Sequence, residues 1–232
     1  MSSERIGERF YDARSTDAQH LNEQRTCDRL LTIRQQVEIP ILGGASIAQF
    51  ISFNGLSAVD EHLAIRLGEP NIEAPLVRLH SECMTGDVFG SQRCDCGPQL
   101  VESLRNFADQ GGYVLYLRHE GRGIGLYAKL DAYELQSHGL DTYEANRRLG
   151  FDEDLRDYTD AANMLRALNV ERIRLISNNP EKQAQLEALG IEVVERLPTG
   201  VYMTAHNQNY LRAKRNRMGH DIRLSGSVRG EP

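Results

Sequence analysis

Four short apolar runs, separated by longer stretches with helical periodicity, dominate the sequence after Pro75. The runs are LVRLH, YVLYL, RIRLIS and EVVERL, and their length and composition predict β-strands. YVLYL is apolar throughout, which is typical of a strand buried on both faces of a sheet. Strands that alternate with helices build a sheet covered by helices. The predicted fold class is therefore α/β (α+β), with a mixed sheet and helices packed on it.

Four helices are predicted from apolar periodicity and from residues that start or end helices. They cover the segment GPQLVESLRNFADQGG, residues 126–138, residues 158–168 and the stretch from Asn179-Pro180 to Leu189. Gly111 and Gly139 are placed to end the first two helices, and Asp157 is placed to cap the third. Pro180 occupies the first position of the fourth helix, where proline is tolerated.

The chain is predicted to hold one catalytic domain between two polar ends. Residues 1–36 are polar and rich in both charge signs, which predicts a frayed or helical extension. From Val37 the segment VEIPILGGASIAQFISFN is β-branched and broken by Gly-Gly, which predicts a strand, a turn and a second strand. The domain is expected to span residues 37–220, and residues 221–232 are expected to be a disordered tail.

Charge and hydropathy narrow the class of protein. The net charge of −6 argues against a general nucleic-acid binder, although it does not exclude a site for a single nucleotide. No apolar run is long enough to span a bilayer. The N-terminus lacks the apolar core of a signal peptide. We therefore expect a cytoplasmic protein that binds neither nucleic acid nor membrane.

Cys83, Cys94 and Cys96 form a cluster within the segment HSECMTGDVFGSQRCDCGPQ, whereas Cys27 stands in a charged stretch and is interpreted as incidental. In a reducing compartment, clustered cysteines indicate a metal site or a catalytic site more often than a disulfide. Three thiolates suit a zinc ion with one open position for water or substrate. His80 is an alternative fourth ligand, which would close the site as Cys₃His. The spacing alone also allows three small hydrophobic side chains in a loop.

Four segments together resemble the consecutive motifs of the GTP cyclohydrolase II family, in order, between about Val37 and His220. They are VRLHSECMTGDVFGSQRCDCGPQL, HEGRGIGL, DTYEANRRLGFDEDLRDY and LISNNPEK. The resemblance implies conversion of GTP to 2,5-diamino-6-ribosylamino-4(3H)-pyrimidinone 5′-phosphate, with release of formate and pyrophosphate, as the first step of riboflavin biosynthesis. It also implies zinc, a magnesium requirement and a homodimer.

The resemblance assigns the zinc ligands to Cys83, Cys94 and Cys96. Zinc can lower the pKa of its water to about 7, and the resulting hydroxide suits attack on C8 of guanine. The resemblance further implies a set of nucleotide contacts: Arg78, His80, Ser81, Glu82, Gln99, Glu120, Gly121, Arg122, Thr142, Ser177 and Lys182. Glu82 and Glu120 are both candidates to accept hydrogen bonds from the base, and the sequence does not choose between them.

The family pattern implies three catalytic residues. Tyr133 is expected near the base, although its place beside Leu126 and Leu130 on a helical face also fits a core residue. Asp154 and Arg156 match the family's proton acceptor and its nucleophile toward the α-phosphate. A guanidinium is always protonated and therefore a poor nucleophile, so stabilisation of phosphoryl charge is the easier role for Arg156. On composition alone, Asp154 and Arg156 also fit an exposed ion pair.

Two positions depart from the family pattern, since His119 stands where glutamine is usual and Asp131 where arginine is frequent. Glu144 is a weaker candidate for the magnesium. Three other functions compete with the full reaction. They are a specialised paralogue that stops at a formylamino intermediate or serves secondary metabolism, a silent homologue that only binds guanine nucleotides, and a zinc-finger-type module, which the acidic charge disfavours.

Overall fold

The computed structural model describes residues 30–57, 61–138, 140, 142–151 and 156–218. The predicted tail 221–232 and the first 29 residues of the predicted extension lie outside this part of the chain. The strands are β1 (Thr32–Ile41), β2 (Ser46–Asn54), β3 (Leu63–Leu67), β4 (Leu76–Ser81), β5 (Gly112–Leu117), β6 (Arg172–Ile176) and β7 (Glu192–Leu197). The helices are α2 (Met84–Asp87), α3 (Cys96–Gln110), α4 (Leu126–Ser137), α5 (Thr142–Arg148), α6 (Thr159–Ala167), α7 (Pro180–Ala188) and α8 (Gln208–Met218), with 3₁₀ turns η3 (Leu42–Gly44) and η4 (Glu120–Gly123).

The strands form one mixed sheet of seven strands in the order β1-β2-β3-β5-β4-β6-β7. β1, β2, β3 and β5 pair antiparallel, whereas β5, β4, β6 and β7 pair parallel. The predicted mixed sheet is therefore confirmed. In the parallel half, Ser81 lies beside Leu117 in register, so β4 and β5 end at the same edge.

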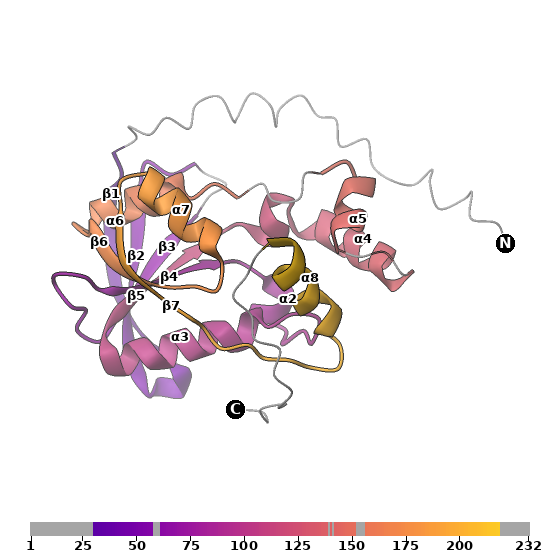
Figure 1. The fold of residues 1–232 in the computed structure, drawn as a ribbon. Helices are drawn as coiled ribbons and strands as arrows, with labels where there is room; N and C mark the ends of the chain where they lie inside the picture. The colour runs from indigo at the N-terminus through magenta and orange to yellow at the C-terminus, as the bar shows by residue number, and fades with distance from the viewer. Residues whose placement is uncertain (1–29, 58–60, 139, 141, 152–155, 219–232) are drawn as a thin grey trace.

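Apolar side chains pack on both faces of the sheet, which makes three layers. Val77 and Leu79 of β4 belong to the core beneath α6 and α7, whereas the adjacent Leu76 belongs to the core beneath α3. This alternation is the two-residue period of a strand. In Figure 1, α3 lies below the sheet, and α6 and α7 lie above it. The predicted strand YVLYL is likewise buried on both faces, because Val114 belongs to the α3 core and Leu115 to the other.

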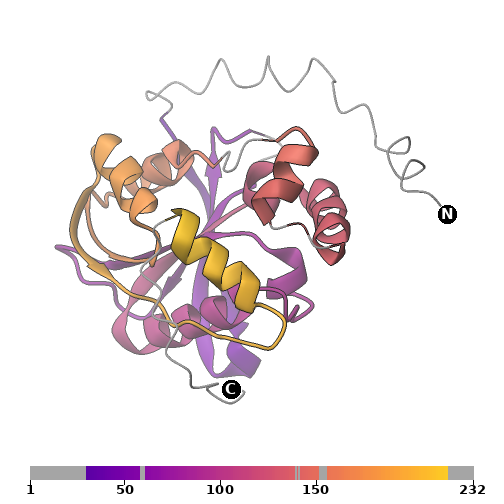
Figure 2. The same ribbon diagram turned by 45° about the vertical axis from the view of Figure 1, so that its right-hand side comes forward.

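The order of the parallel strands places a switch point at β4. The chain leaves β4 through α3 to reach β5 on one side, and it returns through α4, α5 and α6 to β6 on the other side of β4. Ligands of open α/β sheets bind outside the carboxyl ends of the strands at such a point. Helix α8 lies near this edge, between the pair α6 and α7 and the pair α4 and α5 (Figure 1, Figure 2).

The predicted helices after residue 75 are confirmed, with their ends shifted by one or two residues. α3 ends at Gln110, and Gly111 follows with φ 75°, a conformation that favours glycine. The N-cap residue of α6 is Tyr158 and not the predicted Asp157, although the Asp157 carboxylate accepts a hydrogen bond from the Thr159 backbone N–H at 2.8 Å. α7 begins at Pro180, as predicted. Gly139, the predicted end of α4, lies outside the described residues.

The predicted start of the first strand at Val37 is wrong, because β1 begins at Thr32 and residues 32–36 belong to the sheet. Most of β1 is exposed at the edge of the sheet, and its first five residues, TIRQQ, include a single apolar side chain and therefore carry no apolar alternation. Leu31 is nevertheless buried in the core, and Ile33 packs against it. Within the described part of the chain, no helix is both long enough and apolar enough to cross a membrane.

Candidate active site and metal centre

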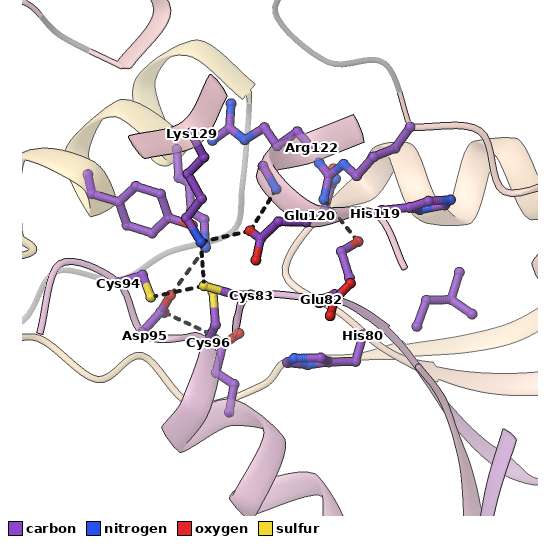
Figure 3. A pocket seen from close by; sticks show the side chains of 18 of the residues that line it. His80, Glu82, Cys83, Cys94, Asp95, Cys96, His119, Glu120, Arg122 and Lys129 are labelled. Carbon is purple, nitrogen blue, oxygen red and sulfur yellow. Dashed lines mark hydrogen bonds and ion pairs between the residues drawn. The ribbon is translucent and has the colours of Figure 1, made fainter. Parts of the chain in front are cut away.

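A pocket opens at the carboxyl ends of β4, β5 and β6, where the fold places its switch point. β4 leads into Cys83, β5 leads into the η4 turn, and β6 leads into the turn before α7. Segments far apart in the sequence therefore meet here because parallel strands end at one edge. Figure 3 shows the resulting walls of the pocket.

The three predicted metal ligands lie together in this pocket. Cys83 directly precedes α2, Cys96 is the first residue of α3, and Cys94 lies two residues before it. All three Sγ atoms lie within 4.8 Å of one another, and those of Cys83 and Cys94 are 3.6 Å apart. Tetrahedral zinc with Zn–S distances of about 2.3 Å requires sulfurs about 3.8 Å apart. The donor set and its spacing therefore fit a zinc ion with three protein ligands.

Gly86 leaves the space that this cluster occupies. A Cβ atom at position 86 would lie 2.8 Å from Sγ of Cys94 and 3.1 Å from Sγ of Cys83. The sulfurs thus approach the backbone of α2 so closely that no side chain fits between them. The space for the sulfurs is therefore provided by the backbone of α2.

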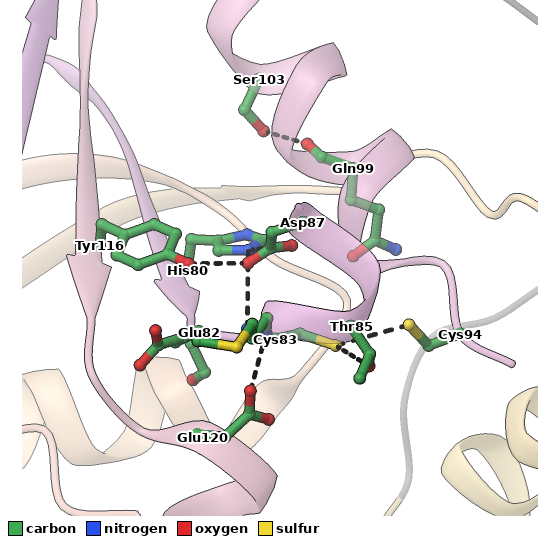
Figure 4. A network of polar contacts seen from close by, with 12 residues as sticks. His80, Glu82, Cys83, Thr85, Asp87, Cys94, Gln99, Ser103, Tyr116 and Glu120 are labelled. Carbon is green, nitrogen blue, oxygen red and sulfur yellow. Dashed lines mark hydrogen bonds and ion pairs between the residues drawn. The ribbon is translucent and has the colours of Figure 1, made fainter. Parts of the chain in front are cut away.

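His80 is not a member of the sulfur cluster, so the alternative of a closed Cys₃His site is not supported among the described residues. Its Nε2 donates to the carboxylate of Asp87 at 3.0 Å, and its ring stacks on Tyr116 (Figure 4). Asp87 also accepts hydrogen bonds from the Tyr116 hydroxyl and from the Cys83 backbone N–H, each at 3.0 Å. Burial lowers the pKa of His80, although the bond to Asp87 opposes this shift. Asp87 therefore orients both the His80 ring and the backbone of Cys83.

Lys129 joins the sulfur cluster to Glu120. Its Nζ donates to Sγ of Cys83 at 3.2 Å and to Oε1 of Glu120 at 2.7 Å (Figure 3). Burial lowers the pKa of Lys129, but the hydrogen bond to Glu120 and the nearby Cys83 outweigh burial and raise it overall. Hydrogen bonds from Cys94 and Cys96, together with the charge of Lys129, lower the pKa of the Cys83 thiol. This site favours a thiolate at Cys83.

The two candidate base readers have different environments. Glu120 accepts hydrogen bonds from the backbone N–H of Met84 and Gly121 at 2.7 and 2.8 Å, in addition to the bond from Lys129. Among the described residues, the side chain of Glu82 accepts one hydrogen bond, from Nε of Arg118 at 2.8 Å, through Oε2. Oε1 of Glu82 is therefore more available to a ligand than either oxygen of Glu120.

A chain of polar side chains forms another wall of the pocket. Arg78 donates to Oε1 of Gln99 at 2.9 Å, and Nε2 of Gln99 donates to Asp95 at 2.8 Å. Asp95 in turn pairs with Lys214 of α8 at 3.2 Å. The buried Nε of Arg78 has no hydrogen-bond partner among the described residues, which leaves one donor for a ligand. Arg78 and Gln99, both predicted nucleotide contacts, thus lie in direct contact.

The predicted anion-binding residues line the end of the pocket near α7. Lys182 lies on the first turn of this helix, and its Nζ donates to the Leu79 carbonyl at 2.7 Å. Ser177 precedes the helix, and its hydroxyl accepts from the Asn179 backbone N–H at 3.0 Å. A helix N-terminus favours an anion because its N–H groups and dipole point toward it.

Arg156 and the η4 turn complete the ligand-facing surface. A guanidinium N–H of Arg156 donates to the Ser81 hydroxyl at 3.4 Å. The alternative of an exposed ion pair with Asp154 stays a prediction, because Asp154 lies outside the described residues. Gly121 and Arg122 both have positive φ, at 61° and 67°. Positive φ is rare for a residue with a side chain and often marks a functional turn.

Tyr133 lines the pocket and is only partly buried. Leu130, which was predicted to share a core face with it, is 45% exposed, so the interpretation of this face as core is not supported. The ring lies 5.0 Å from the guanidinium carbon of Arg93 and 5.7 Å from Nζ of Lys129. Burial raises the pKa of Tyr133, although Lys129 lowers it in part. The hydroxyl therefore stays protonated at neutral pH.

Two predicted site residues cannot be placed. Asp154 lies outside the described residues, and Thr142 begins α5 without a described side chain. Conversely, sequence reasoning missed Asp87, Lys129 and Lys214. Lys129 stands one helical turn before Tyr133, and this i,i+4 spacing was the available signal. Lys214 lies 119 positions from Asp95, and nothing in the sequence joins them.

The chain has clear relatives. A sequence profile of the GTP cyclohydrolase II family matches residues 33–198. GTP cyclohydrolase-2 of Vibrio parahaemolyticus is 50% identical over 195 residues, which cover 83% of this chain and 98% of the relative, and that of Vibrio cholerae is 51% identical with the same coverage. The riboflavin biosynthesis protein RibBA of Bacillus cereus is 46% identical over 83% of this chain and 49% of its own length.

A solved two-domain 3,4-dihydroxy-2-butanone 4-phosphate synthase from A. baumannii matches with a TM-score of 0.35 and 19% identity over 66% of this chain and 36% of its own. This similarity is too low to bear on function. The profile match and the extent of the two Vibrio alignments are decisive. The chain belongs to the GTP cyclohydrolase II family of enzymes.

Proposed function

We propose that this chain hydrolyses GTP to 2,5-diamino-6-ribosylamino-4(3H)-pyrimidinone 5′-phosphate, releasing formate and pyrophosphate, in riboflavin biosynthesis. The observation that carries the proposal is the cluster of three cysteine sulfurs within a pocket of a family member. The same pocket is lined by the Glu82 carboxylate, which can accept hydrogen bonds from a guanine base, and by several cations that can bind phosphates.

Cys83, Cys94 and Cys96 are proposed to hold zinc, since their sulfurs have the spacing that the ion requires. Bound there, zinc supplies hydroxide at neutral pH, because it lowers the pKa of a coordinated water to about 7. Tyr133 lies beside the cluster, and its protonated hydroxyl can donate a proton to a purine nitrogen as the imidazole ring opens.

Glu82 is the proposed reader of the guanine base. Its carboxylate is held by Arg118 through one oxygen, and the other oxygen is left to accept bonds from N1–H and the 2-amino group. Glu120 already accepts three bonds from the protein, so its proposed role is to hold the walls of the site together. This role predicts a preference for guanine, because a base without the 2-amino group offers Glu82 one hydrogen-bond donor fewer.

The triphosphate is proposed to lie toward α7, where Lys182 and Ser177 surround a helix N-terminus. Arg156 is proposed to stabilise charge on the phosphoryl group that is cleaved, with Asp154 orienting the guanidinium. Among the described residues, the three cysteines form the one side-chain group suited to a metal. We therefore propose that Mg²⁺ arrives on the triphosphate, since this ion commonly binds through substrate phosphates and retains several waters.

The test is product analysis of the purified chain with GTP, zinc and magnesium. A coupled formate assay and mass spectrometry are expected to detect formate and the diaminopyrimidinone, and Cys94→Ser is expected to abolish both. Glu82→Gln is expected to raise the KM for GTP more than that for ITP, which lacks the 2-amino group. Full activity of Cys94→Ser, or of the chelated protein, would contradict the zinc mechanism.

The same assay distinguishes the two alternative functions that are related to this family. A paralogue that stops early yields a ring-opened formylamino nucleotide without formate, and a silent homologue binds GTP and leaves it intact. The homodimer and the cytoplasmic location stay predictions. Light scattering during size-exclusion chromatography tests the homodimer.

A further inference from the structure

Lys129 places an ammonium group between the sulfur cluster and Glu120, and the proposed reaction gives this residue no role. Its Nζ lies 3.2 Å from Sγ of Cys83 and 2.7 Å from Oε1 of Glu120 (Figure 3). The side chain is only 10% exposed. Burial of a charge is costly unless the charge is paired and hydrogen-bonded. The site therefore retains this cation through its two anionic partners.

We propose that Lys129 is a positioning residue of the metal centre, which hydrogen-bonds the Cys83 thiolate and thereby limits the negative charge that this sulfur donates to the metal. The inference rests on the proposed zinc site but not on GTP as substrate. Three thiolates and Zn²⁺ carry a net charge of −1, and Glu120 adds a second negative charge nearby. Lys129 offsets this excess at the sulfur itself.

The contact is held from both ends. The backbone N–H of Lys129 donates to the Gly125 carbonyl at 3.1 Å, which fixes the start of the side chain in α4. At the other end, Glu120 is held by the backbone N–H of Met84, the residue next to Cys83. The ammonium thus lies between the Glu120 carboxylate and the Cys83 thiolate, and the segment Cys83-Met84 holds both of these groups in place. A charge-assisted hydrogen bond in this setting is directional, unlike a distant charge.

Lys214 provides an internal comparison. Its Nζ also lies beside the cluster, but its bond is to Oδ1 of Asp95 at 3.2 Å and not to a sulfur. Both lysines carry the same charge and both are largely buried, with 10% and 14% of the side chain exposed. Replacement of each by methionine removes one positive charge with a similar volume. Only Lys129→Met removes a bond to a metal ligand.

The test is the absorption spectrum of the full-length protein loaded with Co²⁺ in place of zinc. Without its hydrogen bond, the Cys83 thiolate holds its electrons less tightly, so the sulfur-to-cobalt charge-transfer band of Lys129→Met is expected at longer wavelength. Lys129→Arg, which keeps the charge and donors, is expected to restore the band in part. Lys214→Met is expected to leave it unchanged. Zinc affinity of Lys129→Met is expected to fall by about 10- to 100-fold, as for other outer-shell partners.

Two results of the cobalt spectra would overturn the inference. One is a Lys129→Met band at the wild-type wavelength, and the other is an equal shift in Lys129→Met and Lys214→Met, which would indicate net charge without a specific bond. Circular dichroism of each variant verifies that it is folded. A higher KM for GTP with unchanged metal properties would reassign Lys129 to the substrate and also refute this role. Wild-type protein that binds cobalt without cleaving GTP would instead count against the proposed function alone.

Discussion

Alanine at position 86 is predicted to weaken binding of the proposed zinc ion while the fold is retained. The new Cβ would lie 2.8 Å from Sγ of Cys94, 3.1 Å from Sγ of Cys83 and 3.3 Å from Cβ of Cys96. Non-bonded atoms prefer separations of about 3.5–4.0 Å, so Sγ of Cys94 must retreat by at least about 0.7 Å. Metal–ligand distances tolerate only about 0.2 Å. The substitution therefore disturbs the metal site directly.

The expected magnitude follows from the cost of overpacking, which is about 1–3 kcal/mol. At about 1.4 kcal/mol for each tenfold change, zinc affinity is expected to fall by about 5- to 140-fold. The fold itself should tolerate the change, because alanine is a better helix former than glycine by about 1 kcal/mol and position 86 lies within α2. In the metal-free protein, the cysteine side chains can rotate away from the new methyl group.

The assay is competition for zinc with a chromophoric chelator, alongside thermal unfolding of the metal-free protein. Val88→Ala is the matched control, since Val88 follows the same short helix and is 68% exposed. It is expected to bind zinc like the wild type. The reasoning is refuted if Gly86→Ala binds zinc within twofold of the wild type, or if it loses zinc only because it unfolds.

Three further outcomes are expected. Asp87→Asn should lower the free energy of unfolding by about 1–3 kcal/mol, measured by urea denaturation, because the buried carboxylate accepts bonds from three donors; Asp109→Asn, at an exposed position, should change it little. Arg172→Ala, which breaks an exposed ion pair with Glu192, should leave the urea midpoint close to that of the wild type, and a clear drop in the midpoint would contradict the view that exposed pairs contribute little. Removal of zinc by a chelator should abolish formate release and leave the far-UV circular dichroism intact, since the sulfurs lie outside both apolar cores; zinc should restore activity, and magnesium alone should not.

The fold was predictable where burial imposes a period on the sequence. β5 contains the predicted run YVLYL and buries Val114, Leu115 and Leu117, and α6 buries Ala161, Ala162 and Leu165 as its periodicity indicated. The start of β1 was not predictable, because an exposed edge strand is not under the burial constraint that produces such a period. Burial therefore made the central strand and α6 predictable, whereas the polar start of β1 gave no such signal.

The candidate site was predictable only in its most distinctive residues. Three cysteines within fourteen positions are rare enough to indicate a metal, and the structure brings their sulfurs together. A single lysine on a helix, by contrast, has the appearance of a solvated charge. Lys129 acquires a role only when the topology places α4 against Cys83. Residues that tune a site depend on tertiary contacts, which local patterns do not encode.

The charge of the pocket differs from that of the whole chain. The protein has a net charge of −6, yet its pocket is lined by more cations than carboxylates: Arg78, Arg93, Arg122, Lys129, Arg156, Lys182 and Lys214 against Glu82, Asp95 and Glu120. Lys129 and Lys214 balance Glu120 and Asp95 beside the sulfurs. The remaining cations leave a local positive excess, which suits the polyphosphate of the proposed substrate. This excess follows from where the charges lie, and the net charge of the chain alone would not predict it.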